Sequence, residues 1–98
     1  MSCYFMVNIY LNHPDQRAAY DQYIKEVKPI VESYGGEYLV RTEALTALSE
    51  AWRPDRFIII RFPDRTRMDA CFASEQYGRI KALRTETVES RVIIADGI

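Results

Sequence analysis

Histidine and cysteine are scarce in this chain, which has one histidine and two cysteines among 98 residues. A zinc site needs about four such ligands, and a Ser-His-Asp triad needs its histidine beside two partners, so neither kind of site is indicated. Cys3 and Cys71 each stand alone in an apolar segment, which predicts buried thiols, with a disulfide or a metal pair as the alternative. We therefore expect no metal and no cofactor.

An excess of charge of one sign and a long hydrophobic run are also lacking. Thirteen Lys and Arg face 14 Asp and Glu, a formal net charge of −1, whereas nucleic-acid binders carry a basic stripe. No apolar run approaches the roughly 18 residues of a membrane span. The start of the chain, Met1-Ser2-Cys3, has no basic region of the kind that opens a signal peptide. We expect a cytoplasmic protein that binds neither nucleic acid nor membrane.

Glycine and proline are few, with four of each, so little interrupts regular structure. Hydrophobic residues make up 48% of the chain and charged residues 28%, which is typical of a globular protein. No repeat, linker or low-complexity segment divides the sequence. A single domain over residues 1–98 is predicted, and it is long enough for a modest core.

Periodicity predicts strands and helices in a simple order. Alternating or continuous apolar patterns predict strands at 3–11, 37–42, 56–62 and 91–95, with a continuation of the second strand through 44–48 after a bend or bulge. Apolar residues from Tyr20 to Tyr34 recur at steps of three and four, which indicates one buried helical stripe that ends at Gly35-Gly36. After the third strand, one helix is predicted around Met68, and Ser74 is expected to cap a further helix that reaches Val88.

This order is typical of an α+β protein with a ferredoxin-like βαββαβ arrangement, a four-stranded antiparallel sheet with helices on one face. The strand Phe57-Ile58-Ile59-Ile60-Arg61-Phe62 carries large apolar side chains on both of its faces. Helices on one side bury only one of them. A second copy of the chain is the simplest cover for the other, so a homodimer, a dimeric α/β barrel, is predicted.

Five segments spaced along nearly the whole chain carry a family resemblance. They are Tyr34-Gly35-Gly36-Glu37-Tyr38-Leu39-Val40-Arg41, Trp52-Arg53-Pro54-Asp55-Arg56, Arg61-Phe62-Pro63, Ser74-Glu75-Gln76-Tyr77 and Leu83-Arg84. In combination they resemble domain of unknown function 1330, a family of the dimeric α/β-barrel superfamily. The resemblance implies a ferredoxin-like protomer, usually dimeric, with no settled activity. Related barrels include cofactor-free monooxygenases, isomerases, haem enzymes and ligand-sensing domains, so the fold alone does not select a function.

Two arginines are the most informative polar residues. Arg84 shares a helical face with Tyr77, and Arg41 interrupts an apolar strand beside Leu39. A buried arginine is costly unless it is paired. Arg84 is therefore expected either to form an ion pair with a carboxylate such as Glu43 or Glu50, or to bind an anionic ligand through its planar fork. For Arg41 the alternatives are an ion pair at a dimer interface and a pocket wall shared with Arg84.

Three more residues are candidates for shaping a ligand site. Asn8 is a mid-strand amide that needs hydrogen-bond partners if it is buried, either structural ones or an oxyanion. Trp52 lies in a loop, where it stacks on an aromatic ligand or plugs a sheet edge. Tyr77 offers a phenol hydroxyl to a ligand, or packs in the core.

His13 and Glu43 are the candidates for catalysis. His13 is the only histidine and stands at a junction between a strand and a helix, where exposed or capping roles are common. Glu43 is a possible general base if burial raises its pKa. Neither belongs to a recognisable catalytic motif, so the sequence leaves open whether the protein is an enzyme.

These observations favour a cytoplasmic homodimer that binds a small anionic or aromatic metabolite in a pocket between sheet and helices. Arg41 and Arg84 are expected to hold the anion, with Asn8, Trp52 and Tyr77 around it. The first alternative is a cofactor-independent isomerase or monooxygenase. The second is a purely structural or interaction module whose arginines form ion pairs.

Overall fold

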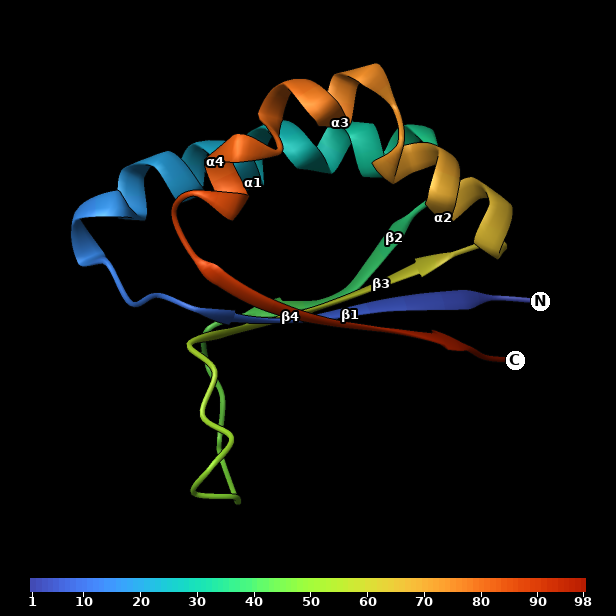
Figure 1. The fold of residues 1–98 in the computed structure, drawn as a ribbon. Helices are drawn as coiled ribbons and strands as arrows, with labels where there is room; N and C mark the ends of the chain where they lie inside the picture. The colour runs from blue at the N-terminus through green and yellow to red at the C-terminus, as the bar shows by residue number, and fades with distance from the viewer.

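The computed structural model describes residues 1–98 as a sheet with a layer of helices above it (Figure 1). The strands are β1 (Cys3–Tyr10), β2 (Glu37–Thr42), β3 (Arg56–Phe62) and β4 (Glu89–Asp96). They form one sheet in the order β2-β3-β1-β4, and every neighbouring pair is antiparallel. The predicted α+β ferredoxin-like arrangement is confirmed.

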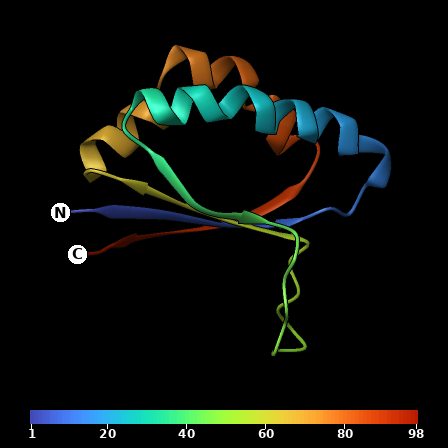
Figure 2. The same cartoon turned by 180° about the vertical axis from the view of Figure 1, so that it is seen from behind.

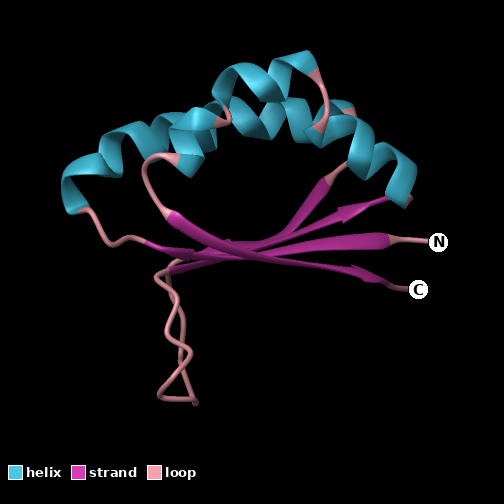
Figure 3. Cartoon of the chain, in the orientation of Figure 1, coloured by secondary structure: helices cyan, strands magenta, loops and turns pink.

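All helices lie on one face of this sheet, as the two opposite views in Figures 1 and 2 and the colouring in Figure 3 show. They are a short 3-10 helix (Pro14–Gln16), α1 (Arg17–Ser33), α2 (Arg65–Phe72), α3 (Glu75–Ile80) and α4 (Ala82–Thr85). The helix predicted to reach Val88 ends at Thr85 and is divided in two. None of these helices combines the length and the apolar character that crossing a membrane demands.

Between the two layers lies the hydrophobic core, which contains 14 buried residues. The stripe predicted on α1 supplies Tyr20, Tyr23, Val27 and Val31. β3 contributes the residues of its inward face, Ile58, Ile60 and Phe62. Burying a side chain of this size contributes roughly 1.5–3 kcal/mol, so the interlayer contacts are the main source of stability.

The helix ends follow the sequence signals. Gly35 has a φ of 83°, a conformation that glycine adopts without penalty, and it ends α1 as predicted. The Asp64 carboxylate caps α2 by accepting a hydrogen bond from the Arg67 amide at 2.8 Å. The Ser74 hydroxyl caps α3 by accepting one from the Tyr77 amide at 3.2 Å. These bonds satisfy amides that a helix leaves without partners.

An irregularity in β2 changes which side chains share a face. Tyr38 pairs with Ile60 and Val40 with Ile59, so Leu39 has no cross-strand partner of its own. Simple alternation along the strand predicts that Arg41 lies on the same face as Leu39 and on the opposite face from Tyr38. This prediction was wrong, because an extra residue in one strand reverses the faces beyond it. Arg41 pairs with the inward-facing Ile58 and lies on the helix side.

Residues 43–55, here called the arm, project from the opposite side of the sheet (Figures 1 and 2). They contain no strand, so the predicted continuation of the second strand through residues 44–48 was wrong. The arm is anchored at its base. The Asp55 carboxylate accepts a hydrogen bond from the Leu11 amide at 2.7 Å, and the Asp55 amide donates to the Ile9 carbonyl at 2.9 Å.

Both cysteines are free and buried in the core, as predicted. Burial raises the pKa of the Cys71 thiol to about 11, and burial together with the nearby Asp96 raises that of Cys3.

We expect an aromatic disulfide reagent at pH 8 to react at least about a hundredfold more slowly with the folded protein than with the protein in denaturant, because the thiolate is the nucleophile. Rapid labelling of the folded protein would contradict this expectation. Repeating the labelling with Cys71→Ala would show which of the two cysteines reacts.

Candidate functional site

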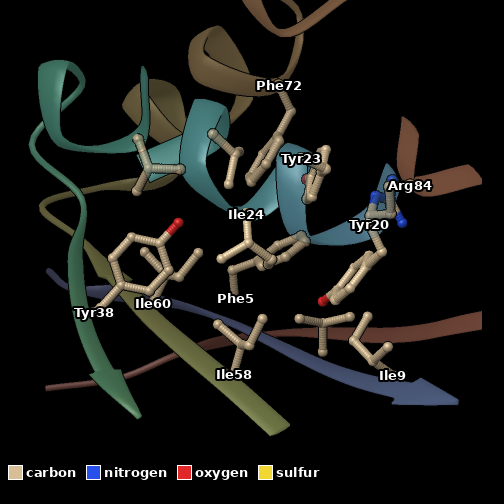
Figure 4. Close-up of a pocket in the computed structure, with 13 residues that line it drawn as sticks. Phe5, Ile9, Tyr20, Tyr23, Ile24, Tyr38, Ile58, Ile60, Phe72 and Arg84 are labelled. Carbon is tan, nitrogen blue, oxygen red and sulfur yellow. The ribbon is translucent and has the colours of Figure 1, made fainter. Parts of the chain in front are cut away.

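A cavity of about 30 Å³ lies between the sheet and the helices (Figure 4). Thirteen residues line it; twelve are hydrophobic, and the remaining one is Arg84. The aromatic members of the lining are Phe5, Tyr20, Tyr23, Tyr38 and Phe72. The site therefore combines an apolar, ring-rich wall with a single cationic group, a composition common in small-molecule sites.

The Arg84 guanidinium meets hydroxyl groups and no carboxylate. Its Nε donates a hydrogen bond to the Tyr77 hydroxyl at 3.2 Å, and that oxygen lies 3.1 Å from the Tyr23 hydroxyl. None of the ion pairs in the structure includes Arg84. The ion pair with Glu43 or Glu50, the structural alternative for this residue, is not formed. Arg84 thus remains a positive charge next to an apolar cavity.

The tyrosine hydroxyls around this cavity are neutral at physiological pH. Burial raises the pKa of Tyr20 to about 12 and that of Tyr38 to about 12. Burial and the Tyr77 hydroxyl raise the pKa of Tyr23 further. A neutral phenol donates a hydrogen bond but supplies no negative charge. The hydroxyls therefore orient Arg84 without neutralising it.

Arg41 does not meet Arg84. Its guanidinium lies 5.1 Å from the centroid of the Tyr38 ring, and its side chain is exposed at the edge strand. Tyr38 lines the cavity, whereas Arg41 stands outside it. No ion pair includes Arg41 either, so its contact within the chain is a cation–π one. The predicted pocket wall shared by the two arginines is not formed in this structure.

Asn8 and Trp52 lie on the opposite side of the sheet from the cavity. Asn8 alternates with the inward-facing Val7 and Ile9 on β1, so it points away from the helices. The Trp52 indole Nε1 donates to the Asn8 Oδ1 at 3.0 Å and so ties the arm to the sheet. Together they border an open groove of about 370 Å³ beside the arm. Their placement around the same pocket as Arg84 was wrong, although a role in binding is untested.

Neither catalytic candidate reaches the cavity. His13 is exposed just before the 3-10 helix and lines only shallow surface hollows. Glu43 lies at the base of the arm, where both of its oxygens accept hydrogen bonds from Arg17, at 2.9 and 2.7 Å. These bonds hold the pKa of the Glu43 carboxyl below its usual value. The hypothesis of a base with a raised pKa was therefore wrong, because a cationic partner outweighs burial.

Sequence reasoning missed Tyr20 and Tyr23 as residues of the site. Both were recognised only as members of a buried stripe. A periodic stripe shows that a side chain is buried, yet it cannot show whether a hydroxyl meets a partner or a cavity. The signal was present only as an unusual number of tyrosines, seven in the chain.

Comparison with known families settles the relationship suggested by the sequence. The model of a family described as a domain of unknown function (DUF1330) matches residues 2–98. This chain belongs to the DUF1330 family. No curated protein matches the chain.

Solved structures with the same fold cover almost the whole chain. A protein of unknown function from Rhodopseudomonas palustris aligns over 99% of this chain and 82% of its own, with 18% identity and a TM-score of 0.81. A dimeric ferredoxin-like protein of unknown function from Jannaschia sp. CCS1 aligns over 99% and 100%, with 10% identity and a TM-score of 0.83. SnoaB, a cofactor-independent oxygenase from Streptomyces nogalater, aligns over 99% and 93%, with 8% identity and a TM-score of 0.70. At these identities the likeness establishes the fold alone.

The environment of Glu43 predicts a pH-dependent contribution to stability. A lowered folded pKa means that the contribution is complete above the ordinary value of 4.5 and is lost as the pH falls through the folded value. We expect Glu43→Gln to lower the free energy of unfolding at pH 7 by no more than about 1 kcal/mol, since the pair is partly exposed. Urea titrations at pH 7 and pH 3 measure this difference. If the free energy of unfolding of Glu43→Gln fell further below that of the parent at pH 3 than at pH 7, the ion-pair assignment would be contradicted.

Proposed function

We propose that this protein is a homodimeric binding protein for a small anionic, partly aromatic metabolite, held in the cavity between sheet and helices. One observation carries the proposal: the Arg84 side chain is half-buried beside an apolar cavity and has no carboxylate partner within the chain. Tyr77, a predicted site residue, contributes by orienting Arg84 through its hydroxyl. Arg41 does not line the cavity, but its guanidinium contacts the ring of Tyr38, which does.

Within the chain, no carboxylate compensates the charge of Arg84. Moving a cation out of water costs several kcal/mol, and hydrogen bonds to neutral hydroxyls offset only part of this. An incoming carboxylate would offset the rest, because the guanidinium presents two parallel donors to its two oxygens. The five aromatic side chains of the lining suit a ring attached to that carboxylate. The charge and the lining together favour a small aromatic acid.

The observed cavity volume of about 30 Å³ accommodates one or two water molecules rather than a ring. Binding of an aromatic acid therefore requires side chains to move. Ile24 and Tyr38 are half-buried members of the lining, and they are the side chains that we expect to rotate. Exposed or half-buried rotamers change within nanoseconds, so such opening need not limit the binding rate.

A cofactor-independent isomerase or monooxygenase is the alternative with one observation in its favour. Neutral phenols beside a guanidinium are suitable donors to an enolate oxygen, which develops negative charge during such reactions. This reading needs a base, and His13 and Glu43 both lie outside the cavity. The likeness to the Streptomyces nogalater oxygenase supports the fold but not its chemistry. Binding without turnover therefore requires fewer assumptions.

Arg84→Met tests the binding site, with benzoate as the probe. At ten times its dissociation constant a ligand adds about 1.4 kcal/mol to stability, which raises the melting temperature of a domain of this size by roughly 5–10 °C. We expect this rise in the parent protein and its loss in Arg84→Met. The unliganded variant should be as stable as the parent or more so, because the substitution removes an uncompensated buried charge.

Arg79→Met is the matched control, since Arg79 lies on the neighbouring helix with a largely exposed side chain. It should keep the full benzoate response. A cost of about 3–5 kcal/mol in unliganded Arg84→Met would indicate a carboxylate partner in solution. That result, together with no response to benzoate in the parent protein, would favour the structural module over the binding protein.

The proposed homodimer rests on the sheet face opposite the helices. That face carries Met6, Phe57, Ile59 and Ile93, and no element of the chain covers it (Figure 1). Ile93 is 63% exposed. Contiguous apolar patches of this kind mark interaction surfaces, and a two-fold contact between identical faces is the simplest cover. The Jannaschia neighbour, which is dimeric, supports the same assembly.

Ile93→Glu tests this interface. The side chain is well exposed in the single chain, so a charge there should leave the fold intact but should be excluded from a dimer interface. We expect sedimentation at micromolar concentration to give twice 11.4 kDa for the parent and 11.4 kDa for the variant. Ala70→Glu, exposed on α2 away from this face, should remain dimeric. A monomeric parent would refute the proposal.

A further inference from the structure

Tyr20 has a buried hydroxyl that meets no partner within the protein. The residue is 1% exposed, it lines the cavity, and its oxygen makes no hydrogen bond. The hydroxyls of Tyr23 and Tyr77, by contrast, bond to each other. Figure 4 shows the Tyr20 oxygen directed towards the strands, away from Arg84.

A second buried donor that acts on Tyr20 also lacks an acceptor, although it does not line the cavity. The Nε of Arg56 is also buried without a partner, while its Nη1 lies 3.5 Å from the Glu43 carboxylate. The charged groups that act on the Tyr20 hydroxyl are Arg56, Arg84, Glu43 and Arg17, three cations and one anion. The local field is therefore positive and favours an electronegative atom next to the hydroxyl.

Leaving such a hydroxyl unpaired in an apolar core is unfavourable, since buried polar groups nearly always find partners. Phenylalanine would fill the same space without that cost. An unpaired buried polar group in a folded protein requires an explanation, and a ligand that supplies the missing partner is one. The raised pKa of Tyr20, about 12, keeps the hydroxyl protonated and able to donate.

We propose that Tyr20 determines ligand specificity by donating a hydrogen bond to a second oxygen of the ligand, separate from the anionic group bound by Arg84. This inference rests on the proposed binding function. The ligand class narrows to small aromatic acids that also carry a hydroxyl or carbonyl oxygen. A plain aromatic acid would bind through Arg84 alone and would leave the Tyr20 hydroxyl unpaired.

The test compares benzoate with its 2-, 3- and 4-hydroxy derivatives on the parent protein and on Tyr20→Phe. Calorimetric titration should show at least one hydroxybenzoate binding the parent about five- to tenfold more tightly than benzoate does, the size expected for one added hydrogen bond. This preference should vanish in Tyr20→Phe, while the affinity for benzoate stays within about twofold. Arg84→Met should weaken all four ligands alike.

Stability without ligand gives a second readout. Because the Tyr20 hydroxyl is unpaired in the parent, the Tyr20→Phe variant should melt at the same temperature as the parent or higher. Tyr23→Phe is the matched control and should melt lower, because it removes a bonded hydroxyl from the same helix. A lower melting temperature for Tyr20→Phe would overturn the inference, since it would mean that a buried water or a protein group already satisfies the hydroxyl.

The two proposals fail in different ways. Equal affinities for benzoate and every hydroxybenzoate, retained in Tyr20→Phe and lost in Arg84→Met, would overturn the role of Tyr20 and leave the binding function intact. No binding of any of the four acids to the parent protein would overturn both.

Discussion

A continuous chain of aromatic contacts joins the sheet to the helices, and the remaining features of the interior depend on it. Phe5 on β1 stacks on Phe72 of α2 at 4.6 Å between ring centroids, and Phe72 meets Tyr77 of α3 at 5.0 Å. Tyr77 in turn meets Tyr23 of α1 at 6.3 Å, and Tyr23 meets Tyr20 at 6.1 Å. Each contact contributes about 0.5–1.5 kcal/mol beyond burial. Together they fix how far the helices stand from the sheet, and so leave the cavity between them.

This arrangement explains why polar groups are found at the edge of an apolar core. A tyrosine carries a hydroxyl wherever its ring is needed for packing, and each buried hydroxyl then requires a partner. The hydroxyls of Tyr23 and Tyr77 satisfy each other and hold Arg84, whereas that of Tyr20 does not. The candidate site is thus a consequence of building the interlayer contacts from tyrosine. Packing and the proposed ligand recognition use the same rings.

The opposite face of the sheet follows from a different constraint. A single layer of helices covers one face of the four-stranded sheet, and two-layer packing is the usual result. The arm leaves the sheet on the uncovered side and is tied to it through Trp52 and Asn8. Residues that the sequence suggested for a ligand pocket therefore belong to the surface proposed for dimerisation. The two proposed functions use opposite faces of one sheet.

The fold was predictable because its signals are local. Alternation in the strands, the stripe on α1, and the caps at Asp64 and Ser74 depend on neighbours a few residues away. The composition of the candidate site was only partly predictable. Arg84 and Tyr77 were recognised because a charge and a phenol seven residues apart on an apolar helical face are conspicuous in the sequence. Arg41 was misplaced, since an extra residue at Leu39 reverses the faces of β2 and leaves no clear mark in the sequence.

The sequence by itself determined the order of elements, the family, the buried thiols and the presence of two apolar sheet faces. The family is carried by the five spaced segments that resemble it. Periodicity and composition are sufficient for the elements, the thiols and the sheet faces, because each depends on which side chains avoid water. Only the tertiary structure decided which polar atoms have partners. Glu43 is bound by Arg17, 26 residues away in the chain, and not by Arg84, and the Tyr20 hydroxyl has no partner. Hydrogen bonds depend on tenths of an ångström and on angles, which packing alone sets.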